Sequence, residues 1–491
     1  MDSFDLLIVG GGINGAAIAR DAAIRGAKVL LVEKDDLAAH TSSASSKLIH
    51  GGLRYLERYE FRLVREALAE REILLRTAPH IVRPLRFVLP HCPALRPRWM
   101  IRAGLLLYDL FSIRGSLPRS RSVGRRETAL LAPLREPRRV LSYWDAWVDD
   151  SRLVVLNAVA AAELGAEIAT GTELLSARRE GEVWIAELSG GRKVAAKAMV
   201  NAAGPWVAEV LGQRLGETSA SRVRLVKGSH IVVPALWEGD QAYILQQADG
   251  RVVFALPFKG DFTLIGTTDV PVERPGDSSI SPEEIRYLCE AAGRYFTRQV
   301  LPVDVVWSYS GVRALRDDGA ADARSVTRDY RLELDPGPGP KLLSVFGGKI
   351  TTARALAREA LDRLGVEGRR STAHAFLPGG DVYPDFLDWL ERLAQWMPRP
   401  LVARLSGAYG TRLRDMIGEA GSLAALGRHF GAGLYKLELA WLRDREFART
   451  ADDVLWRRTK LGLVMGEDEK RAVEAWFASP RRPSEGWGSG G

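Results

Sequence analysis

FDLLIVGGGINGAAIARDAAIRGAKVLLVE, residues 4–33, combines two apolar runs with a glycine-rich turn and a helical pattern. The runs FDLLIV and AKVLLVE are typical of buried strands, and AIARDAAIRG between them predicts a helix that ends at Gly26. The stretch therefore predicts a βαβ unit.

The glycines of this turn have the spacing of a dinucleotide site. Gly10, Gly12 and Gly15 fill the G-x-G-x-x-G positions, which serve the tight turn, the close approach of backbone to a pyrophosphate and the packing of helix on strand. The helix N-terminus then faces the phosphates. Glu33 ends the second strand about 20 residues later, where a carboxylate accepts hydrogen bonds from a ribose hydroxyl and disfavours a 2′-phosphate. The motif predicts dinucleotide binding and leaves NAD and FAD open.

Length and composition indicate a globular protein of two or three domains. The chain has 491 residues, of which 46% are hydrophobic, enough for a large core. Its two cysteines, Cys92 and Cys289, fit a reducing compartment. Asp2 and Asp5 replace the basic start of a signal peptide, and no apolar run approaches the roughly 20 residues of a membrane span. We therefore expect a cytoplasmic protein without a membrane-spanning segment.

Positive charge is concentrated in one part of the chain. The net charge is +8, and residues 83–139 hold thirteen arginines against Asp109, Glu127 and Glu136, a local balance of 13 − 3 = +10. Apolar and aromatic side chains, among them Trp99, lie between these arginines. The distribution suggests an anionic partner.

Further patterns predict local structure along the chain. Apolar spacing predicts helices over 60–78 and 151–165, whereas alternation and turn residues predict an antiparallel sheet within 222–275. Ser281 followed by Glu284 predicts a capping box at a helix start.

The hydroxyl-rich segment TSSASS, residues 41–46, suits a loop whose serine hydroxyls and amides contact phosphate or ring edges. The alternative is a flexible surface loop.

Several long strings along the chain carry a family resemblance. They are VGGGINGAAIARDAAIRG, TSSASSKLIHGGLRYLERYEFRLVREALAERE, VNAAGPWV, KGSHIVVP, IGTTD, YSGVRAL, TRDY, LLSVFGGKITT and ADDVLWRRTKLG. Taken together, they make the chain resemble the aerobic, FAD-dependent glycerol-3-phosphate dehydrogenases, within the D-amino-acid-oxidase-like flavoprotein superfamily, nearly from end to end. Two positions depart from the family pattern: Ala17 replaces a small glycine, and Ala353 replaces a tyrosine near the expected site.

The resemblance implies an α/β fold: a Rossmann-type FAD-binding domain with an interposed antiparallel-sheet substrate domain and a C-terminal helical domain. The expected boundaries are an FAD-dependent oxidoreductase region at 1–375, with FAD-binding parts at about 1–80, 150–221 and 340–375 and a substrate-binding insertion at about 222–339, a helical domain at 381–480 and a disordered tail at 481–491.

FAD is the implied cofactor. We expect it to be bound noncovalently, because no cysteine or histidine stands in a sequence context that indicates a covalent link to flavin. The residues expected to bind it are Gly10, Gly12, Ile13, Asn14, Gly15, Glu33, Lys34, Thr41, Ser42, Ser45, Ser46, Lys47, Leu48, His50, Gly51, Gly52, Ala203, Gly204, Gly348, Lys349, Ile350 and Thr351. No metal site is expected.

The implied reaction is oxidation of sn-glycerol 3-phosphate to dihydroxyacetone phosphate by hydride transfer to FAD. A dianionic substrate needs fixed cations, and arginine forks suit phosphate geometry. His230 is the expected base, with His50 as the runner-up, and Arg313 and Lys349 could stabilise a developing alkoxide. The residues expected to bind substrate are Arg54, Tyr55, Arg313, Arg328 and Lys349, with His230 as a neutral partner.

Only one nucleotide motif is visible and FAD is expected to occupy it, so NAD(P) has no evident second site. The family resemblance implies a membrane quinone as the electron acceptor. Residues 95–126 mix arginines with Trp99, Leu105–Leu107 and Phe111, and so suit peripheral attachment to the inner face of an anionic membrane. The helix after Lys349 is a second candidate surface. The alternative is that 105–111 packs in the core. A homodimer is left open.

Other classes of protein compete with this interpretation. An NAD-dependent dehydrogenase would use the same glycine motif, an oxygen-using glycerol-3-phosphate oxidase or an amino-acid oxidase would share the fold, and a basic nucleic-acid-binding protein would explain the charge. No nucleic-acid partner is expected, because the sequence has no recognisable nucleic-acid module.

Overall fold

The glycine-rich turn belongs to a βαβ unit, as predicted. It joins β1 (Asp2–Val9) to α1 (Ile13–Ile24), and β2 (Val29–Glu33) follows, parallel to β1. This computed structural model describes residues 1–53, 56, 59–91, 95, 97–112, 115–137, 139–217, 223–316, 330–368 and 371–479.

The first sheet surrounds this unit. Its strands run in the order β17-β18-β10-β1-β2-β7, with β9 paired to β10 and β8 to β9. The central strands β18, β10, β1, β2 and β7 are parallel. The further strands are β7 (Glu167–Thr170), β8 (Leu174–Glu180), β9 (Val183–Leu188), β10 (Lys193–Asn201), β17 (Arg331–Leu334) and β18 (Lys341–Phe346).

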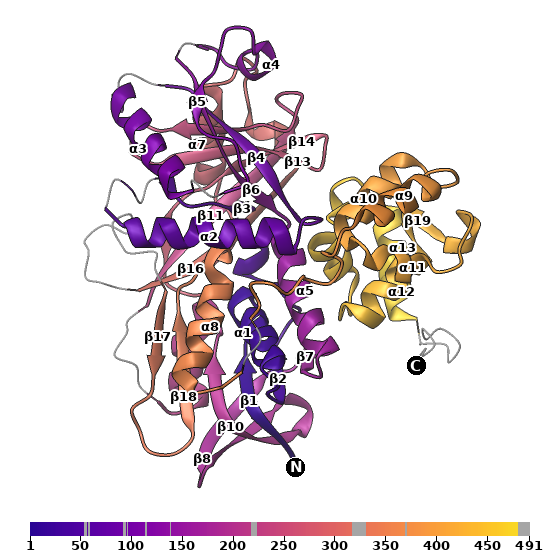
Figure 1. Cartoon of the computed structure of the whole chain (residues 1–491). Helices are drawn as coiled ribbons and strands as arrows, with labels where there is room; N and C mark the ends of the chain where they lie inside the picture. The colour runs from indigo at the N-terminus through magenta and orange to yellow at the C-terminus, as the bar shows by residue number, and fades with distance from the viewer. Residues whose placement is uncertain are drawn as a thin grey trace.

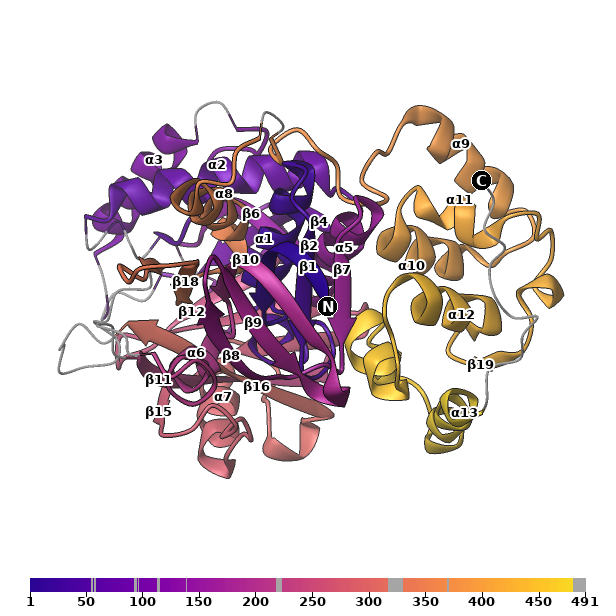
Figure 2. The same ribbon diagram turned by 90° about the horizontal axis from the view of Figure 1, so that it is seen from below.

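Helices cover one face of this parallel sheet, which explains its nearly continuous apolar strands. α1 packs between α5 (Asp150–Glu163) and α8 (Ala353–Leu364), and the three lie together in Figure 1. The other face is covered in part by β8 and β9, seen from below in Figure 2. Ala353 is buried in the helical layer at the start of α8.

A second sheet lies beyond the first. Its order is β15-β11-β14-β13-β12-β4-β6-β3, with β16 paired to β11 and β5 to β6. The strands are β3 (Leu48–Ile49), β4 (Val82–Leu89), β5 (Arg121–Ser122), β6 (Leu141–Val148), β11 (Val223–Pro234), β12 (Ala242–Gln246), β13 (Val252–Phe258), β14 (Phe262–Gly266), β15 (Val270–Val272) and β16 (Trp307–Arg316).

This second sheet is larger than the antiparallel insertion expected from the sequence. Strands β3 to β6 precede the expected insertion in the chain and still join its sheet. They join through β4, which runs parallel to β12, with Ala242 opposite Phe87. The sheet is therefore mixed, because the edge strand of the insertion completes its hydrogen bonds with a chain-distant strand.

Helices pack on both faces of the second sheet. α2 (Phe61–Thr77) and α3 (Arg98–Phe111) cover one face, and α7 (Pro282–Gly293) covers the other. The capping box predicted at the start of α7 is present: Glu284 N–H donates to Ser281 Oγ, and Ser281 N–H donates to the Glu284 carboxylate.

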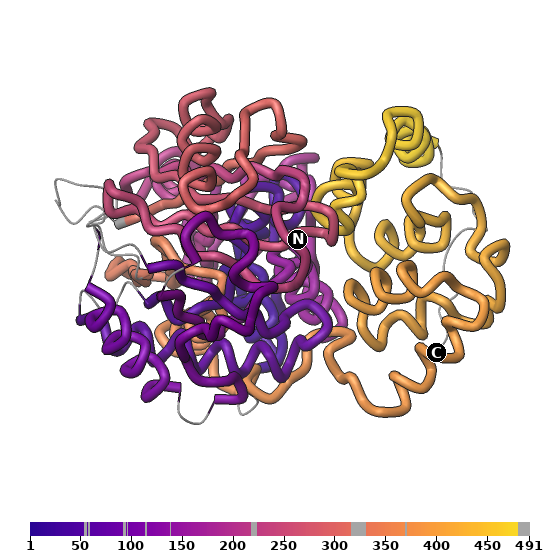
Figure 3. Tube along the Cα trace, turned by 90° about the horizontal axis from the view of Figure 1, so that it is seen from above, coloured from indigo at the N-terminus to yellow at the C-terminus, as the bar shows by residue number. Residues whose placement is uncertain are grey.

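The C-terminal segment forms a helical unit with a core of its own. It stands beside α5 in Figure 1 and is equally distinct from above in Figure 3. Its elements are α9 (Pro384–Leu393), α10 (Arg399–Tyr409), α11 (Arg412–Ile417), β19 (His429–Gly431), β20 (Leu434–Tyr435), α12 (Lys436–Arg445), the helical turn η9 (Asp453–Arg458) and α13 (Glu467–Ala478). The whole of the expected tail, 481–491, lies outside the described residues.

Across the described ranges, none of the helices has the length and apolar character needed to span a bilayer.

Candidate active site

A cavity of about 390 Å³ is lined by residues of both sheets. The ends of β1, β2, β10 and β18 border one part of it, and β11, β13 and β16 border the other. Of the residues predicted to bind cofactor or substrate, those that line the cavity are Gly10, Gly12, Ile13, Asn14, Glu33, Lys34, Thr41, Ser42, Ser45, Ser46, Leu48, His50, Ala203, Gly204, His230, Arg313, Gly348, Lys349, Ile350 and Thr351.

The glycine turn brings backbone to the cavity wall. Gly10 has a φ of +112°, and a Cβ there would lie 2.5 Å from the Ala202 carbonyl oxygen, so only glycine fits. Gly15 packs against the Gly10 backbone instead of lining the cavity. This leaves the first turn of α1 exposed to the cavity, where its backbone N–H groups favour an anion.

Glu33 lies at one end of the cavity and is held rigidly. Its Oε2 accepts the Gly11 N–H at 2.6 Å and its Oε1 accepts the Asp35 N–H at 2.9 Å. Burial raises the pKa of the Glu33 carboxyl, and the two backbone donors oppose that rise. Lys34 is adjacent, with its Nζ 4.3 Å from the centre of the Trp206 ring.

Residues 41–47, here called the flavin loop, follow one wall of the cavity. Ser42 Oγ accepts the Ile13 N–H at 3.0 Å and so satisfies one of the first amides of α1. Ser45 Oγ donates to Asp150 Oδ2 at 2.8 Å, and Ser46 Oγ lies 2.9 Å from His230 Nε2. The loop is thus bound to the protein on several sides and is not a free surface loop.

Three other residues predicted to bind FAD are not among those that line the cavity. Lys47 is buried, and its Nζ forms an ion pair with Asp150 Oδ2 at 2.9 Å. Gly51 is buried, and its N–H donates to Tyr108 Oη at 2.8 Å. Gly52 is also buried. These positions support the walls of the cavity.

The part of the cavity lined by Arg313 of β16 and by Lys349 is here called its basic end. Arg313 Nη2 donates to Asp269 Oδ1 at 2.7 Å and to the Thr268 carbonyl at 3.1 Å. Lys349 and His50 also line this cavity. Arg54, Tyr55 and Arg328, predicted to bind substrate, lie outside the described residues.

His230 is buried between the flavin loop and β16. Its ring stacks on Tyr309, with centroids 4.9 Å apart and planes 19° apart. Burial, followed by the charges of Lys47 and Arg313, lowers the pKa of His230 well below 6.5. The ring is therefore neutral at neutral pH.

Two buried polar atoms at the cavity point to a ligand. Within the part of the chain that the structure describes, Asn14 Oδ1 and His230 Nδ1 are buried without a hydrogen-bond partner. Both residues line the cavity. Buried polar atoms are ordinarily paired, so these atoms offer unused hydrogen-bonding capacity to a bound molecule.

Comparison with known proteins decides which family this site belongs to. The model of the family "FAD dependent oxidoreductase" matches residues 5–363, and that of the "C-terminal domain of alpha-glycerophosphate oxidase" matches residues 370–479. The chain belongs to the FAD-dependent oxidoreductases. The resemblance inferred from the sequence is thereby confirmed.

Relatives of this flavoprotein match it over almost their whole length. A glycerol-3-phosphate dehydrogenase of Pseudomonas aeruginosa is 50% identical, over 98% of this chain and 96% of the relative. A D-erythritol 1-phosphate dehydrogenase of Brucella abortus is 49% identical, over 97% and 98%. The solved structure of a glycerol-3-phosphate dehydrogenase from Bacillus halodurans, complexed with FAD, has a TM-score of 0.75 at 26% identity and covers 97% of this chain and 90% of that one.

The cavity of this flavoprotein fits FAD, the cofactor of its family. Glycine backbone and the start of α1 suit the pyrophosphate, and the anchored Glu33 carboxylate suits a ribose diol. The unpaired Asn14 Oδ1 and the polar residues His230 and Lys349 also line the cavity and can contact the cofactor.

Sequence reasoning missed several residues of the site. Trp206, whose ring lies 4.5 Å from that of His40, lines the cavity and belongs to the quoted string VNAAGPWV. Asp150 and Tyr309 hold the flavin loop and His230, but no local signal connects them to the glycine motif. Phe254 lines the cavity from β13.

We predict that Glu33→Gln weakens FAD binding at least about tenfold, because hydrogen bonds to a charged group are lost or weakened. FAD fluorescence during titration of the apoprotein measures the dissociation constant.

Asp35→Asn is the matched control, since Asp35 is an exposed neighbouring carboxylate outside the cavity lining. Equal dissociation constants for Glu33→Gln and the wild type would contradict the assignment of Glu33 to the ribose.

Proposed function

We propose that this flavoprotein oxidises sn-glycerol 3-phosphate at C2 to dihydroxyacetone phosphate, with noncovalently bound FAD as the hydride acceptor. One observation carries the proposal: the cavity that is lined by Glu33 and the glycine turn is also lined by Arg313, Lys349 and His230. The names of the Pseudomonas aeruginosa and Bacillus halodurans proteins support the same substrate.

The basic end supplies what a phosphate monoester requires. Arginine forks bind phosphate oxygens in pairs, and Arg313 is pre-oriented by Asp269 at 2.7 Å. Lys349 adds a second cation beside the cavity. Held in this way, the phosphate places C2 toward the interior of the cavity, and the two cations oppose negative charge that develops on the C2 oxygen.

His230 takes the proton of the C2 hydroxyl in this proposal. When Nε2 donates to Ser46 Oγ, the lone pair of Nδ1 is available to accept a proton. The lowered pKa keeps the ring neutral before substrate binds. A dianionic substrate raises the histidine's proton affinity on arrival, which favours base catalysis in the complex.

D-Erythritol 1-phosphate is a second candidate substrate. The Brucella abortus relative with that name is 49% identical to this chain, nearly the value of the glycerol-3-phosphate relative. Both substrates place a phosphate on a polyol, so the same cations serve both.

Anaerobic bleaching of the flavin absorbance tests the proposal. Glycerol 3-phosphate should bleach it within the time of turnover, whereas glycerol and D-amino acids should not. Faster bleaching by D-erythritol 1-phosphate than by glycerol 3-phosphate would identify the longer polyol phosphate as the substrate. Bleaching by an amino acid alone would overturn the proposal that the substrate is a polyol phosphate.

We further propose a membrane quinone as the electron acceptor and α3 as the membrane-facing helix. Trp99, Leu106 and Leu110 are 73%, 54% and 59% exposed and share one face of α3. Phe61 contacts Phe111, with ring centroids 5.9 Å apart, and continues this apolar surface.

Part of the predicted membrane segment packs in the core. Leu105 and Tyr108 lie on the opposite face of α3 and are buried against the second sheet. Arg98 and Arg102 donate to Ser122 and Ser120 near the exposed face. The helix therefore offers one face to the core and the other, flanked by cations, to an anionic interface.

We predict that Arg313→Met retains FAD but lowers kcat/KM for glycerol 3-phosphate at least about tenfold, through the loss of a charge-assisted contact. Flavin absorbance and steady-state rates measure the two effects. Arg251→Met, which removes an arginine paired with Asp249 outside the cavity lining, is the control. Equal losses in both variants would refute the phosphate assignment.

We predict that the histidine-dependent acid limb of kcat/KM lies below pH 6.5, because burial and nearby cations favour the neutral ring. Activity falls as the pH drops through this lowered pKa and His230 becomes protonated. The substrate phosphate titrates near pH 6 in every variant, so the ratio of the wild-type profile to that of His230→Gln isolates the histidine. A ratio independent of pH would exclude His230 as the base.

We predict that a Trp99→Ser, Leu106→Ser, Leu110→Ser triple variant floats poorly with phosphatidylglycerol vesicles, whereas the wild type binds and is released by salt. Leu164→Ser with Leu175→Ser is the control, because these leucines are exposed elsewhere. Wild-type protein that fails to bind vesicles, with oxygen as its fastest acceptor, would indicate an oxidase instead.

A further inference from the structure

A line of four rings connects the C-terminal helical segment to the cavity. Trp456 of η9 stacks on Trp307, with centroids 5.0 Å apart and planes 20° apart. Trp307 contacts Tyr309 at 5.1 Å, and Tyr309 stacks on His230 at 4.9 Å. The C-terminal segment thereby reaches His230 through two intervening side chains.

Tyr309 joins this line to the flavin loop. Its hydroxyl donates to the Ser45 carbonyl at 2.8 Å, and Lys47 Nζ lies 4.9 Å from the centre of its ring. Movement of Tyr309 would therefore displace both His230 and residues 45–47.

Trp456 is itself held in place. A Cβ on Gly462 would lie 2.7 Å from the indole, so the glycine backbone packs directly against the ring. Both residues belong to the string ADDVLWRRTKLG, and no step of the proposed reaction uses either one.

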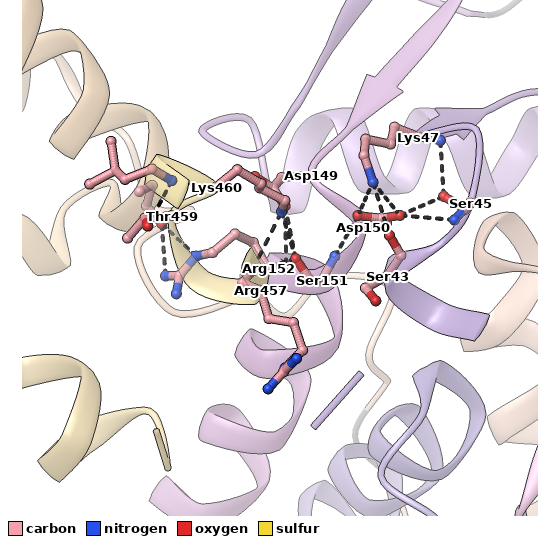
Figure 4. A network of polar contacts seen from close by, with 12 residues as sticks. Ser43, Ser45, Lys47, Asp149, Asp150, Ser151, Arg152, Arg457, Thr459 and Lys460 are labelled. Carbon is pink, nitrogen blue, oxygen red and sulfur yellow. Dashed lines mark hydrogen bonds and ion pairs between the residues drawn. The ribbon is translucent and has the colours of Figure 1, made fainter. Parts of the chain in front are cut away.

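A second, polar connection runs in parallel and is drawn in Figure 4. Lys460 Nζ donates to Asp149 and, at 2.6 Å, to Ser151 Oγ, which donates in turn to the Arg457 carbonyl at 2.5 Å. The neighbouring Asp150 accepts hydrogen bonds from Lys47 Nζ and Ser45 Oγ of the flavin loop.

The same turn also holds the chain that follows Glu33. Arg457 Nε lies 2.6 Å from Asp36 Oδ2, and Arg458 Nη2 lies 2.7 Å from Asp36 Oδ1. The segment between β2 and β3 is thus bound to η9 at Asp36 and to the start of α5 at its other end.

Burial makes these connections sensitive to geometry. Lys47, Lys460, Asp149 and Asp150 are all buried, with two positive and two negative charges. Burial opposes ionisation of Asp149, yet Lys460 and Lys259 hold its pKa well below the usual range. Such pairs are tolerated only in good geometry, and loss of one partner leaves an uncompensated charge.

We propose that the C-terminal helical segment positions the active site, with Trp456 and Lys460 as its positioning residues. Trp456 positions the Tyr309 and His230 rings, and Lys460 positions the start of α5, where Asp150 binds the flavin loop. The effect on FAD rests on the family assignment, and only the effect on the base rests on the proposed function.

Trp456→Leu and Trp456→Phe in the full-length holoenzyme test the aromatic connection. An aromatic stack contributes about two- to tenfold to an equilibrium constant beyond its buried area. We expect Trp456→Leu to raise the FAD dissociation constant by that factor, to change the visible circular dichroism of bound flavin and to shift the histidine-dependent limb of kcat/KM. Trp456→Phe should restore all three.

Trp389→Leu is the matched control, because Trp389 stacks on Phe386 within the same helical segment, with centroids 5.7 Å apart. Equal changes in the Trp456→Leu and Trp389→Leu variants, or none in Trp456→Leu, would overturn the role of Trp456. The FAD and dichroism measurements use no substrate, so they remain valid if glycerol 3-phosphate is not the substrate.

Lys460→Met combined with Asp149→Asn tests the polar connection without leaving a buried charge unpaired. We expect the melting temperature of this double variant to equal that of the wild type. Its FAD binding should nevertheless be weaker than that of the wild type, and the dichroism of its bound flavin should differ. Recovery of all three values would overturn the role of Lys460.

Discussion

The ion pair of Lys47 with Asp150 is the interaction on which the rest of the site depends. Both side chains are buried, and the ammonium lies 2.9 Å from each carboxylate oxygen. Asp150 also accepts from Ser45, so one carboxylate joins the flavin loop to the first turn of α5. Because a buried charge is costly without its partner, this pair allows little variation in how loop and helix meet.

The second constraint is the register of β11 with β16. His230 lies opposite Tyr309, and Val226 lies opposite Arg313, so one strand pair aligns the histidine, its stacking partner and the arginine. A slip by one residue would turn these side chains to the other face of the sheet. The basic end of the cavity therefore depends on strand pairing, whereas the nucleotide end depends on the glycine turn.

Charge is divided along the cavity to match these two ends. Glu33 provides a fixed carboxylate beside backbone donors, while Arg313 and Lys349 bring cations to the basic end. His230 stays neutral between them because burial and neighbouring cations lower its pKa. Such a division binds an anion at the basic end without protonating the group proposed as base.

The sequence by itself determined the features that depend on near neighbours: the glycine turn, Glu33 at the end of β2, helices α2 and α5, and the capping box of α7. With the family resemblance, it also predicted just under half of the residues that line the cavity. Only the tertiary structure decided the partner of Lys47, the entry of β4 into the second sheet, the stack of Trp456 on Trp307 and which face of α3 is buried. These depend on contacts between chain-distant segments, whose energies follow from packing and burial and leave no periodic signal in the local sequence.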